Sequence, residues 1–210
     1  MPEKKYHHGD LKNALIEAGA EILSKEGIGA LSLRKVARRA GVSHAAPYAH
    51  FTDKQALIAA ISTEGYRRLY EELLGVVQQY QADPLRQFVE VAWTYVAFAR
   101  SAPALFKVTF SSVIEKEKDY PAFVEITTKN NLLLVELIQG WQAAGILKPG
   151  PADALAVSVW SLVHGFASLL IENQISHTVL DKLAVRALLL FALNQVSLIP
   201  LDPKDFPPGE

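Results

Sequence analysis

Side chains that can contact a polyanion are concentrated in the stretch LSLRKVARRAGVSHAAPYAHFTDKQAL, residues 31–57. Basic side chains crowd its first half, and two histidines and a tyrosine lie in its second half. These residue types form hydrogen bonds with phosphates and with the edges of bases. Gly41, Val42 and Ser43 separate the two halves and predict a tight turn. The stretch is therefore either a nucleic-acid contact or a corner between two helices that binds nothing.

The common catalytic patterns are absent from the sequence. It contains no Gly-rich phosphate loop, no Gly-x-Ser-x-Gly elbow and no His-Glu-x-x-His helix. It has no cysteine, which excludes a disulfide framework, a thiol nucleophile and a cysteine-based zinc site. His7, His8 and Asp10 could ligate a metal, but adjacent histidines near a chain end rarely act so specifically. We therefore expect no enzymatic activity, no metal and no cofactor.

The composition is that of a globular protein, since 50% of the 210 residues are hydrophobic and 20% are charged. This length allows one or two domains with a sizeable core. The opening MPEKKYHHGDLKNAL has no apolar core of signal-peptide length. Because the absence of cysteine also fits a reducing compartment, we expect a cytoplasmic protein.

The longest apolar segment is LAVSVWSLVHGFASLLI, residues 155–171, which has no acidic side chain, Lys or Arg. Serines, a glycine and His164 interrupt it. It also falls short of the roughly 20 predominantly apolar residues that a membrane span needs. These features favour a buried helix, and we expect no membrane partner.

The net charge of −1 hides an asymmetry along the chain. Residues 1–60 contain nine basic and six acidic side chains, a net charge of +3, and the remainder carries −4. A basic head on an acidic body indicates a polyanionic partner for the head. A solvated charged face would explain so small an excess equally well.

Strand signals are almost absent, and the pattern predicts an all-α protein. Four helices are expected in the first part of the chain, at about residues 10–25, 33–40, 44–51 and 52–81. Asp10, Ser32 and Ser43 can cap the first three of these helices. Gly41 can end the second in a left-handed conformation.

Two short helices that are joined by a tight turn and braced by a preceding helix form a helix-turn-helix. The second short helix enters the major groove, which is about 12 Å wide, and the first crosses the DNA backbone. Small side chains at Ala45, Ala46 and Ala49 would allow a close approach to the groove. Helical spacing directs Leu33, Val36 and Ala37 inward and the basic residues mostly outward.

Residues 6–65 resemble the DNA-binding head of the tetracycline-repressor (TetR) family of bacterial transcriptional regulators. The resemblance rests on the glycine break at Gly27, on VARRAGVS, and on PYAHFTDKQAL, which is similar to the family's Tyr-x-His-Phe-x-x-Lys-x-x-Leu. The opening YHHGDL resembles one subset of the family. The resemblance implies an N-terminal three-helix head with a helix-turn-helix.

The resemblance also implies roles for the matching positions. An N-terminal arm with Lys4, Lys5 and Tyr6 would reach the backbone or the minor groove, and the start of the second helix would contact backbone or a base edge through Ser32 and Arg34. The third helix would face the groove with Ser43, His44, Ala45 and Ala46. Contacts with phosphate or sugar would come from Tyr48, His50 and Lys54.

Each of these roles has a simpler alternative. Tyr48 could pack inside the head, and His50 could be an ordinary surface histidine. Pro47 stands where many members of the family carry an aliphatic residue. A proline inside a helix removes a hydrogen bond and clashes with the preceding turn, but it is tolerated in the first turn. The third helix is therefore expected to be short or bent at its start.

The remaining chain predicts five helices, at residues 84–101, 103–113, 121–145, 152–174 and 179–199. In the family that the head resembles, this part binds a small molecule and forms the dimer. The resemblance implies that helices 152–174 and 179–199 pair with their copies in a four-helix bundle. We accordingly expect residues 1–53 to form the DNA-binding domain, 54–81 a connecting helix and 82–210 the ligand-binding and dimerisation domain.

Aromatic side chains of the body are the candidates for a ligand site. Trp160 to Gly165, WSLVHG, resembles a Trp-x-x-x-His-Gly signature of one subset of the family, and a helix brings Trp160 and His164 onto one face. A buried imidazole needs a partner, which could be a ligand or a neighbouring side chain. The full set of candidates is Trp93, Phe106, Phe110, Trp141, Trp160 and His164. These residues could equally be plain core.

The sequence thus predicts a homodimeric regulator, a repressor, that binds a near-palindromic double-stranded DNA operator and is released by an unknown small-molecule effector. The alternative is a helical ligand-binding adaptor whose head contacts protein instead of DNA. Salt dependence separates the two, since phosphate binding weakens steeply as salt rises.

Overall fold

The computed structural model describes residues 8–111, 114 and 117–207. Within these ranges the long elements are all helices, and extended pairing is limited to an isolated antiparallel bridge between Leu147 and Ser197. The all-α prediction is confirmed.

The chain forms two compact units that are discontinuous in sequence. Unit 1 consists of the residues up to Arg68 together with Ala102–Thr128, and unit 2 consists of Leu69–Ser101 together with residues from Lys129 onward. Helices α3 (Lys54–Gln79) and α6 (Pro121–Ala143) each contribute to both units. The division at residues 53 and 81 stays a prediction about function, because the compact units follow packing and not the order of the chain.

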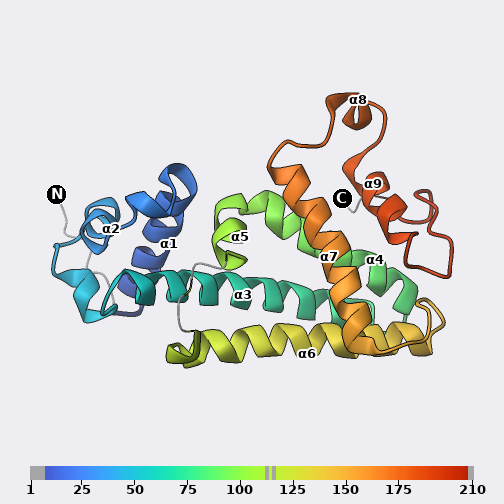
Figure 1. Ribbon diagram of the computed structural model, residues 1–210, viewed down its shortest axis with the longest axis horizontal. Helices are drawn as coiled ribbons and strands as arrows, with labels where there is room; N and C mark the ends of the chain where they lie inside the picture. The colour runs from blue at the N-terminus through green and yellow to red at the C-terminus, as the bar shows by residue number, and fades with distance from the viewer. Residues whose placement is uncertain (1–7, 112–113, 115–116, 208–210) are drawn as a thin grey trace. The chain divides into compact units, whose positions relative to one another are not determined.

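Unit 1 is built around the first half of α3. Its other elements are α1 (His8–Glu26), η1 (Ile28–Ala30), α2 (Leu33–Ala40), η2 (Ala46–Ala49), α5 (Pro103–Thr109), η3 (Glu117–Asp119) and the first turns of α6. Helix α1 packs against α2 and α5 (Figure 1). One face of α1 is apolar and buried, through Leu15, Ala18, Ile22 and Leu23.

Helix α1 begins at His8, so the prediction that Asp10 caps it is wrong. Gly9 costs a helix only about 1 kcal/mol relative to alanine, which does not prevent the earlier start.

Gly65 in α3 allows a close approach between α3 and α5. A Cβ atom at this position would lie 1.8 Å from Thr109 Oγ1 in α5. The two helices can therefore meet here only because residue 65 has no side chain.

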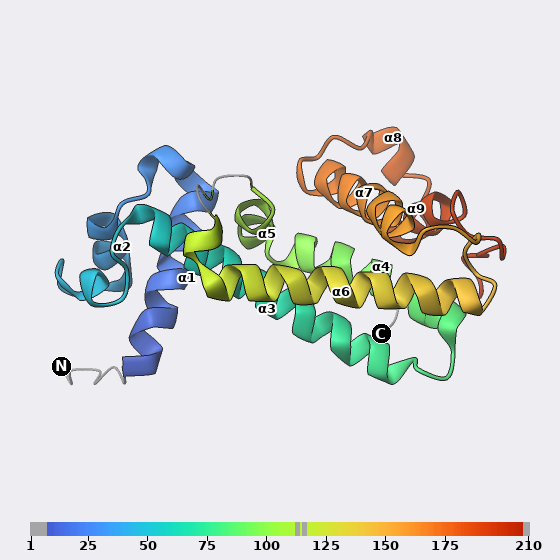
Figure 2. The same ribbon diagram turned by 60° about the horizontal axis from the view of Figure 1, so that its bottom comes forward.

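Unit 2 contains α4 (Pro84–Ser101), α7 (Ala152–Ile171), α8 (His177–Leu180) and α9 (Val185–Leu193), with the later parts of α3 and α6. Helix α4 packs against α7 and α9, and α7 also packs against α9 (Figures 1 and 2). Phe88, Ile138, Trp141 and Leu189 are fully buried in its core.

The predicted helix 179–199 is wrong, because this segment forms α8, a turn and α9. Ala184 has an extended backbone (φ −61°, ψ 147°), which interrupts the helical hydrogen bonds before Arg186 enters the core. At the other end, the Asn194 side chain bonds both the N–H and the C=O of Leu201, at 2.8 and 3.0 Å. These tertiary contacts divert a segment that has no proline or glycine to stop a helix.

Helix α7 is, among the described residues, long and apolar enough to cross a membrane by length and composition alone. Its mean hydropathy is 1.9, and 28% of its apolar window is buried in the single chain. Core helices of soluble proteins pass the same test, so this is weak evidence for a span. What it does indicate is an apolar surface that a single chain leaves uncovered.

Candidate nucleic-acid interface

Helix α2 has the capping contacts that the sequence predicts at both ends. Ser32 Oγ accepts a hydrogen bond from Lys35 N at 3.2 Å. Gly41 follows the helix in the left-handed region (φ 70°), and Val42 N donates to Ala37 O at 3.0 Å, the pattern of a Schellman turn. The caps fix where α2 begins and where the chain turns away from it.

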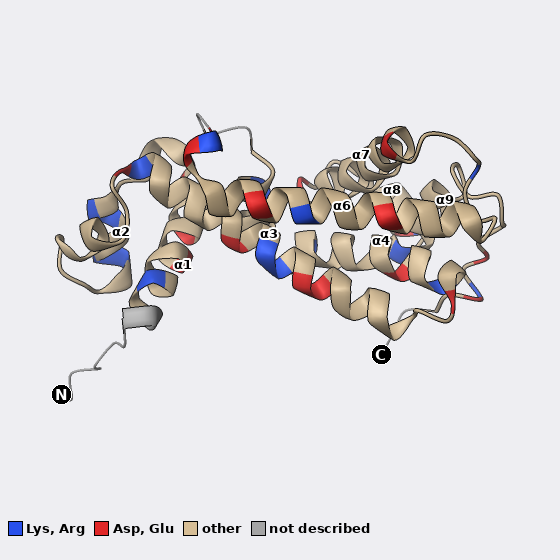
Figure 3. Cartoon of the chain, turned by 90° about the horizontal axis from the view of Figure 1, so that it is seen from below, with Lys and Arg blue, Asp and Glu red and all other residues tan. Residues whose placement is uncertain are grey.

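One face of α2 is buried and the other carries basic side chains. Leu33, Val36 and Ala37 are buried, as predicted. Lys and Arg gather on this helix (Figure 3). Arg34 and Arg38 are exposed, and within the described part of the chain neither has an ion pair.

The other two basic residues of α2 are bound to α1. Arg39 forms ion pairs with Glu21 at 2.7 Å and with Glu26 at 3.7 Å, and Lys35 pairs with Glu26. Hydrogen bonds from Lys25 and Arg39 lower the pKa of Glu21, and the bond from Lys35 lowers the pKa of Glu26. These pairs join α2 to α1 and leave Arg34 and Arg38 available to a partner.

The predicted third helix, residues 44–51, is wrong, because the structure has a turn followed by the short 3-10 helix η2. An α-helix here would need Pro47 to donate to Ser43 O, and proline has no N–H. Ala46 N donates to Ser43 O instead, at 3.0 Å, and Tyr48 N donates to Ala45 O at 3.1 Å. The predicted cap by the Ser43 side chain is also wrong, since η2 has no side-chain cap and Ser43 accepts a hydrogen bond through its carbonyl.

This recognition segment, residues 43–50, presents polar side chains over an apolar anchor. Ser43, His44 and Ala45 are exposed, Ala46 is half-buried, and Tyr48 is 56% exposed. Pro47 and Phe51 are buried beneath the segment. The alternative in which Tyr48 packs inside the head is therefore wrong.

The start of α3 follows directly. Asp53 Oδ1 accepts from Ala56 N at 2.8 Å and caps the helix. Lys54 Nζ donates to the carbonyl of Ile28 in η1, which uses one of its three donors. His50 is half-buried, and its backbone N–H donates to Pro47 O at 3.0 Å. DNA contact by His50 and Lys54 stays a prediction.

Some predicted residues lie outside the described residues. These are Lys4, Lys5, Tyr6 and His7, together with the side chains of His8 and Asp10.

Two of the predicted ligand residues belong to a hydrogen-bonded cluster in unit 2. His164 Nδ1 lies 2.8 Å from the Tyr95 hydroxyl, and Trp160 Nε1 donates to the same hydroxyl at 3.1 Å. Burial lowers the pKa of His164, which favours the neutral imidazole. Sequence reasoning missed Tyr95, because nothing in the spacing of α4 and α7 connects positions that are 65 and 69 residues apart.

The other predicted ligand residues have core partners of their own. In unit 2, Trp141 is buried edge-on against Phe88 with ring centres 5.0 Å apart. Trp93 lies 5.1 Å from the guanidinium of buried Arg186. In unit 1, Phe106 and Phe110 contact each other with ring centres 4.8 Å apart. The six candidates therefore do not form one cluster within either unit.

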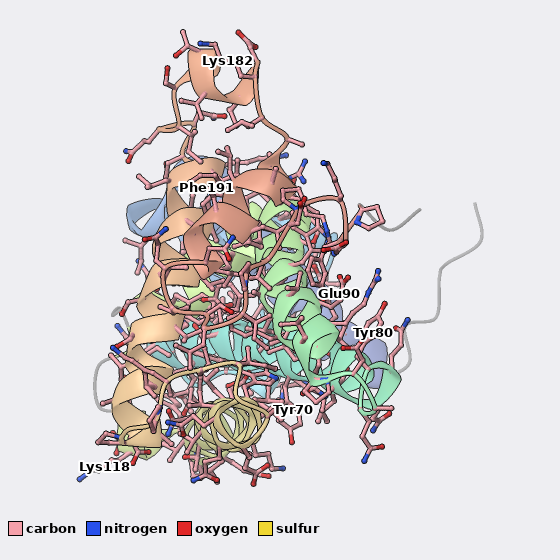
Figure 4. The ribbon with its side chains drawn as sticks, turned by 90° about the vertical axis from the view of Figure 1, so that its right-hand side faces the viewer. Tyr70, Tyr80, Glu90, Lys118, Lys182 and Phe191 are labelled. Carbon is pink, nitrogen blue, oxygen red and sulfur yellow. The ribbon has the colours of Figure 1, made fainter. Side chains whose placement is uncertain are left out.

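A buried ion pair in unit 2 was likewise missed. Arg186, 5% exposed, donates to Glu90 at 2.6 Å through Nη2 and to Phe206 O at 3.1 Å through Nε. Glu90 lies on α4 (Figure 4). The pair connects α9, α4 and the C-terminal segment.

Comparisons with known proteins match both parts of the chain. Residues 15–61 match the family described as bacterial regulatory proteins, tetR family, and residues 88–193 match the tetracyclin repressor-like C-terminal domain. An uncharacterised HTH-type transcriptional regulator, YobS of Bacillus subtilis, is 25% identical over 167 residues, 79% of this chain and 81% of YobS.

Solved structures share the fold along nearly the whole chain. A protein of unknown function from Rhodococcus sp. RHA1 is 31% identical, with a TM-score of 0.74 over 92% of this chain and 96% of the other. A tetR-family regulatory protein, also from Rhodococcus RHA1, is 19% identical, with a TM-score of 0.70 over 89% and 96%. At 19% identity the second likeness shows the fold alone.

Proposed function

Because the chain belongs to the tetracycline-repressor family of bacterial transcriptional regulators, we propose that it is a repressor that binds a near-palindromic operator as a homodimer and is released by a small molecule. DNA binding and transcriptional regulation are the function of the family. Its members are regulators and not enzymes, and they generally bind effectors and act as dimers. The proposal adds four points for this chain: it represses, its operator is nearly palindromic, it binds as a homodimer, and a small molecule releases it from DNA.

One observation carries the DNA-binding part of the proposal. In the described part of unit 1, Arg34 and Arg38 are exposed and form no ion pair, and the recognition segment exposes His44 and Tyr48 over buried Pro47. Arginine, histidine and tyrosine are suited to phosphates and base edges. Burial of Pro47 and Phe51 holds the backbone that carries His44 and Tyr48 in place, and the capped helix α2 carries the two arginines.

The uncovered apolar surface of unit 2 supports the homodimer. Val157, Trp160 and Leu169 of α7 are 60%, 42% and 46% exposed, and Phe191 of α9 is 70% exposed (Figure 4). Several large apolar side chains exposed on two helices that pack together support an interaction site here. Members of the family are soluble cytoplasmic proteins, so a second copy and not lipid would cover it. We place the dimer contact on residues 152–171 and on the α8–α9 segment, in place of one long last helix.

The effector site is proposed around Tyr95, Trp160 and His164. Trp160 is part of the exposed apolar surface and also bonds the partly buried Tyr95–His164 pair. A ligand that bonds either polar group would have to replace an internal hydrogen bond. For release, the ligand must bind the DNA-free arrangement more tightly than the DNA-bound one.

The functional division of the chain remains as the sequence suggests: residues 1–53 contact DNA, 54–81 connect, and 82–210 bind the effector and the second copy. This division is supported by the position of the recognition segment in unit 1 and of the apolar surface in unit 2.

The test is selection of DNA from a random duplex pool by the full-length protein, followed by titration of the selected sequence at several salt concentrations. An enriched near-palindrome would support the proposal, as would an affinity that falls about 10³-fold or more between 50 and 200 mM salt. No enrichment by folded, dimeric protein would overturn it and favour the adaptor alternative.

A further inference from the structure

A cleft of about 370 Å³ opens within unit 1, apart from the proposed effector site. Its walls come from α1, from the end of the recognition segment, from α3, and from residues 119–123, which run from the end of η3 into α6. The start of α6 lies beside α3 in both ribbon views (Figures 1 and 2). The volume is at the lower end of the range for small-molecule sites, about 300 to 1,000 Å³.

The floor of the cleft is apolar and made of small side chains. Ala56, Ala59 and Ala60 line it from α3, where positions three and four apart share a helix face. Ile16 and Phe51 add larger apolar walls. Methyl groups leave room above the helix that a leucine or phenylalanine would fill, so the cleft can accept an apolar group from outside the chain.

The charges at the cleft are not equivalent. Glu64 accepts hydrogen bonds from Arg67 at 2.8 Å and from Arg68 at 2.6 Å. Burial raises its pKa, but the bonds from the two arginines outweigh this effect and lower it overall, so Glu64 is ionised and neutralised locally. Lys12 and Asp119 also line the cleft, and within the described ranges neither side chain has a hydrogen bond or ion pair. One cation and one anion are therefore open to an occupant.

We propose that this head cleft binds a zwitterion with an apolar side chain, that is, an amino acid with a large apolar side chain. The ammonium group of the ligand pairs with Asp119. Its carboxylate pairs with Lys12 and accepts from the amide of Asn13, which also lines the cleft. The apolar side chain lies on the alanines of α3. A ligand with only one of the two charges leaves Lys12 or Asp119 without its partner.

Occupancy of the head cleft lowers affinity for DNA; this step rests on the proposed function. His50 and Phe51 line the cleft, and His50 ends the recognition segment two residues after exposed Tyr48. An occupant therefore contacts the recognition segment directly, inside the unit that binds DNA. Linkage requires that DNA lower the affinity for the ligand by the same factor.

The first experiment is calorimetric titration of the full-length protein with L-phenylalanine in the absence of DNA. Phenethylamine and 3-phenylpropionate, which keep the ring and one charge each, serve as comparison ligands. We expect one phenylalanine site per chain and binding about fivefold weaker for each singly charged compound, as the loss of one ion pair at a rim predicts.

Variants locate the site. Asp119→Asn is expected to weaken phenylalanine binding about fivefold, and Ala60→Phe to abolish it by filling the cleft. Glu117→Gln is the matched control, because Glu117 lies in the same short helix, is exposed, and does not line the cleft. It is expected to leave the affinity unchanged. Circular dichroism shows whether Ala60→Phe is folded, and Asp119→Asn decides the matter if it is not.

Absence of saturable binding up to about 10 mM phenylalanine, or an Asp119→Asn variant with unchanged affinity, would overturn the site. Equal affinity for all three compounds would overturn the zwitterion. With the selected operator, phenylalanine is expected to weaken DNA binding about fivefold, and unchanged DNA affinity would overturn the coupling. Failure to bind DNA without phenylalanine would count against the proposed function and not against the cleft.

Discussion

Polar side chains are used in opposite ways in the two units. In unit 1 the recognition segment and Arg34 face solvent, while Lys35 and Arg39 of the same helix are held by carboxylates of α1. In unit 2 the polar groups singled out above bond each other internally: Arg186 bonds Glu90, and His164 bonds Tyr95. Unit 1 therefore offers ready contacts to a partner, whereas a ligand of unit 2 must compete with bonds that already exist.

Breaking the inward pair is expected to have the largest effect. Arg186→Ala removes the nearer cation from Glu90, whose side chain is 12% exposed, and leaves only the longer pair with Arg86 at 3.4 Å. Loss of one member of a buried ion pair costs about 3 to 5 kcal/mol. Denaturant unfolding should show this loss in the free energy of unfolding. Arg100→Ala, at an exposed position of α4, is the control, and similar losses in both variants would contradict a special role for the buried pair.

Packing of unit 1 depends on the missing side chain at Gly65. Gly65→Ala would place its methyl group against Thr109 Oγ1, and forced overpacking costs about 1 to 3 kcal/mol. Gly75→Ala on the same helix is the control, because among the described residues no atom beyond the neighbouring backbone of α3 lies within 4 Å of its Cβ position. It is expected to stabilise α3 by about 0.5 to 1 kcal/mol. Thermal unfolding that ranks the two variants in the reverse order would contradict the close contact.

The difference between open and paired cations of α2 can be measured on DNA. Arg34→Ala should weaken binding to many sequences and reduce the slope of log affinity against log salt by about 1, as the loss of a phosphate contact predicts. Lys35→Ala removes the same charge from a residue already paired with Glu26, so the slope should hardly change. Equal slopes for the two variants would remove Arg34 from the contact surface.

A smaller effect is expected when a serine that caps a helix is compared with one that does not. Ser32→Ala removes the hydrogen bond to Lys35 N and is expected to destabilise α2 by about 1 kcal/mol. Ser43→Ala removes a side chain with no capping bond, and the free energy of unfolding should stay nearly constant. A comparable loss in both would mean that Ser43 caps after all.

His164 gives unit 2 a pH dependence. Burial lowers its pKa below the ordinary value of 6.5, so the unfolded chain takes up a proton first. The corresponding stability is complete above about pH 6.5 and is lost as the pH falls toward the folded-state pKa. His164→Gln should flatten this part of the profile of unfolding midpoint against pH, whereas His44→Gln, at an exposed site, should not. Identical profiles would contradict the burial effect.

Local signals in the sequence predicted local structure well. The caps of α2 at Ser32 and Gly41, its buried face and the all-α class are confirmed, because each follows from neighbouring residues. Pro47 predicted a short third helix. The 3-10 geometry could not be predicted, because it depends on which backbone N–H donates to Ser43 O when Pro47 has no N–H to offer.

Long-range pairs explain what sequence reasoning could not find. Arg186 and Glu90 are 96 residues apart, and no periodicity connects them. The break before α9 has the same origin, since the segment from Val179 to Leu193 reads as one helix until the core position of Arg186 is known. Unit 1 also combines two stretches that are separate in the sequence. Packing joins them, as the contact of Gly65 with Thr109 illustrates.

Pro47 has a consequence for the thermodynamics of recognition. Its ring fixes one backbone angle, and its burial beside Phe51 fixes the position of the segment. A segment that is already ordered loses little conformational entropy when a partner binds. Its association with DNA should therefore carry a small ordering penalty, and the protein can recognise its operator as a preformed shape.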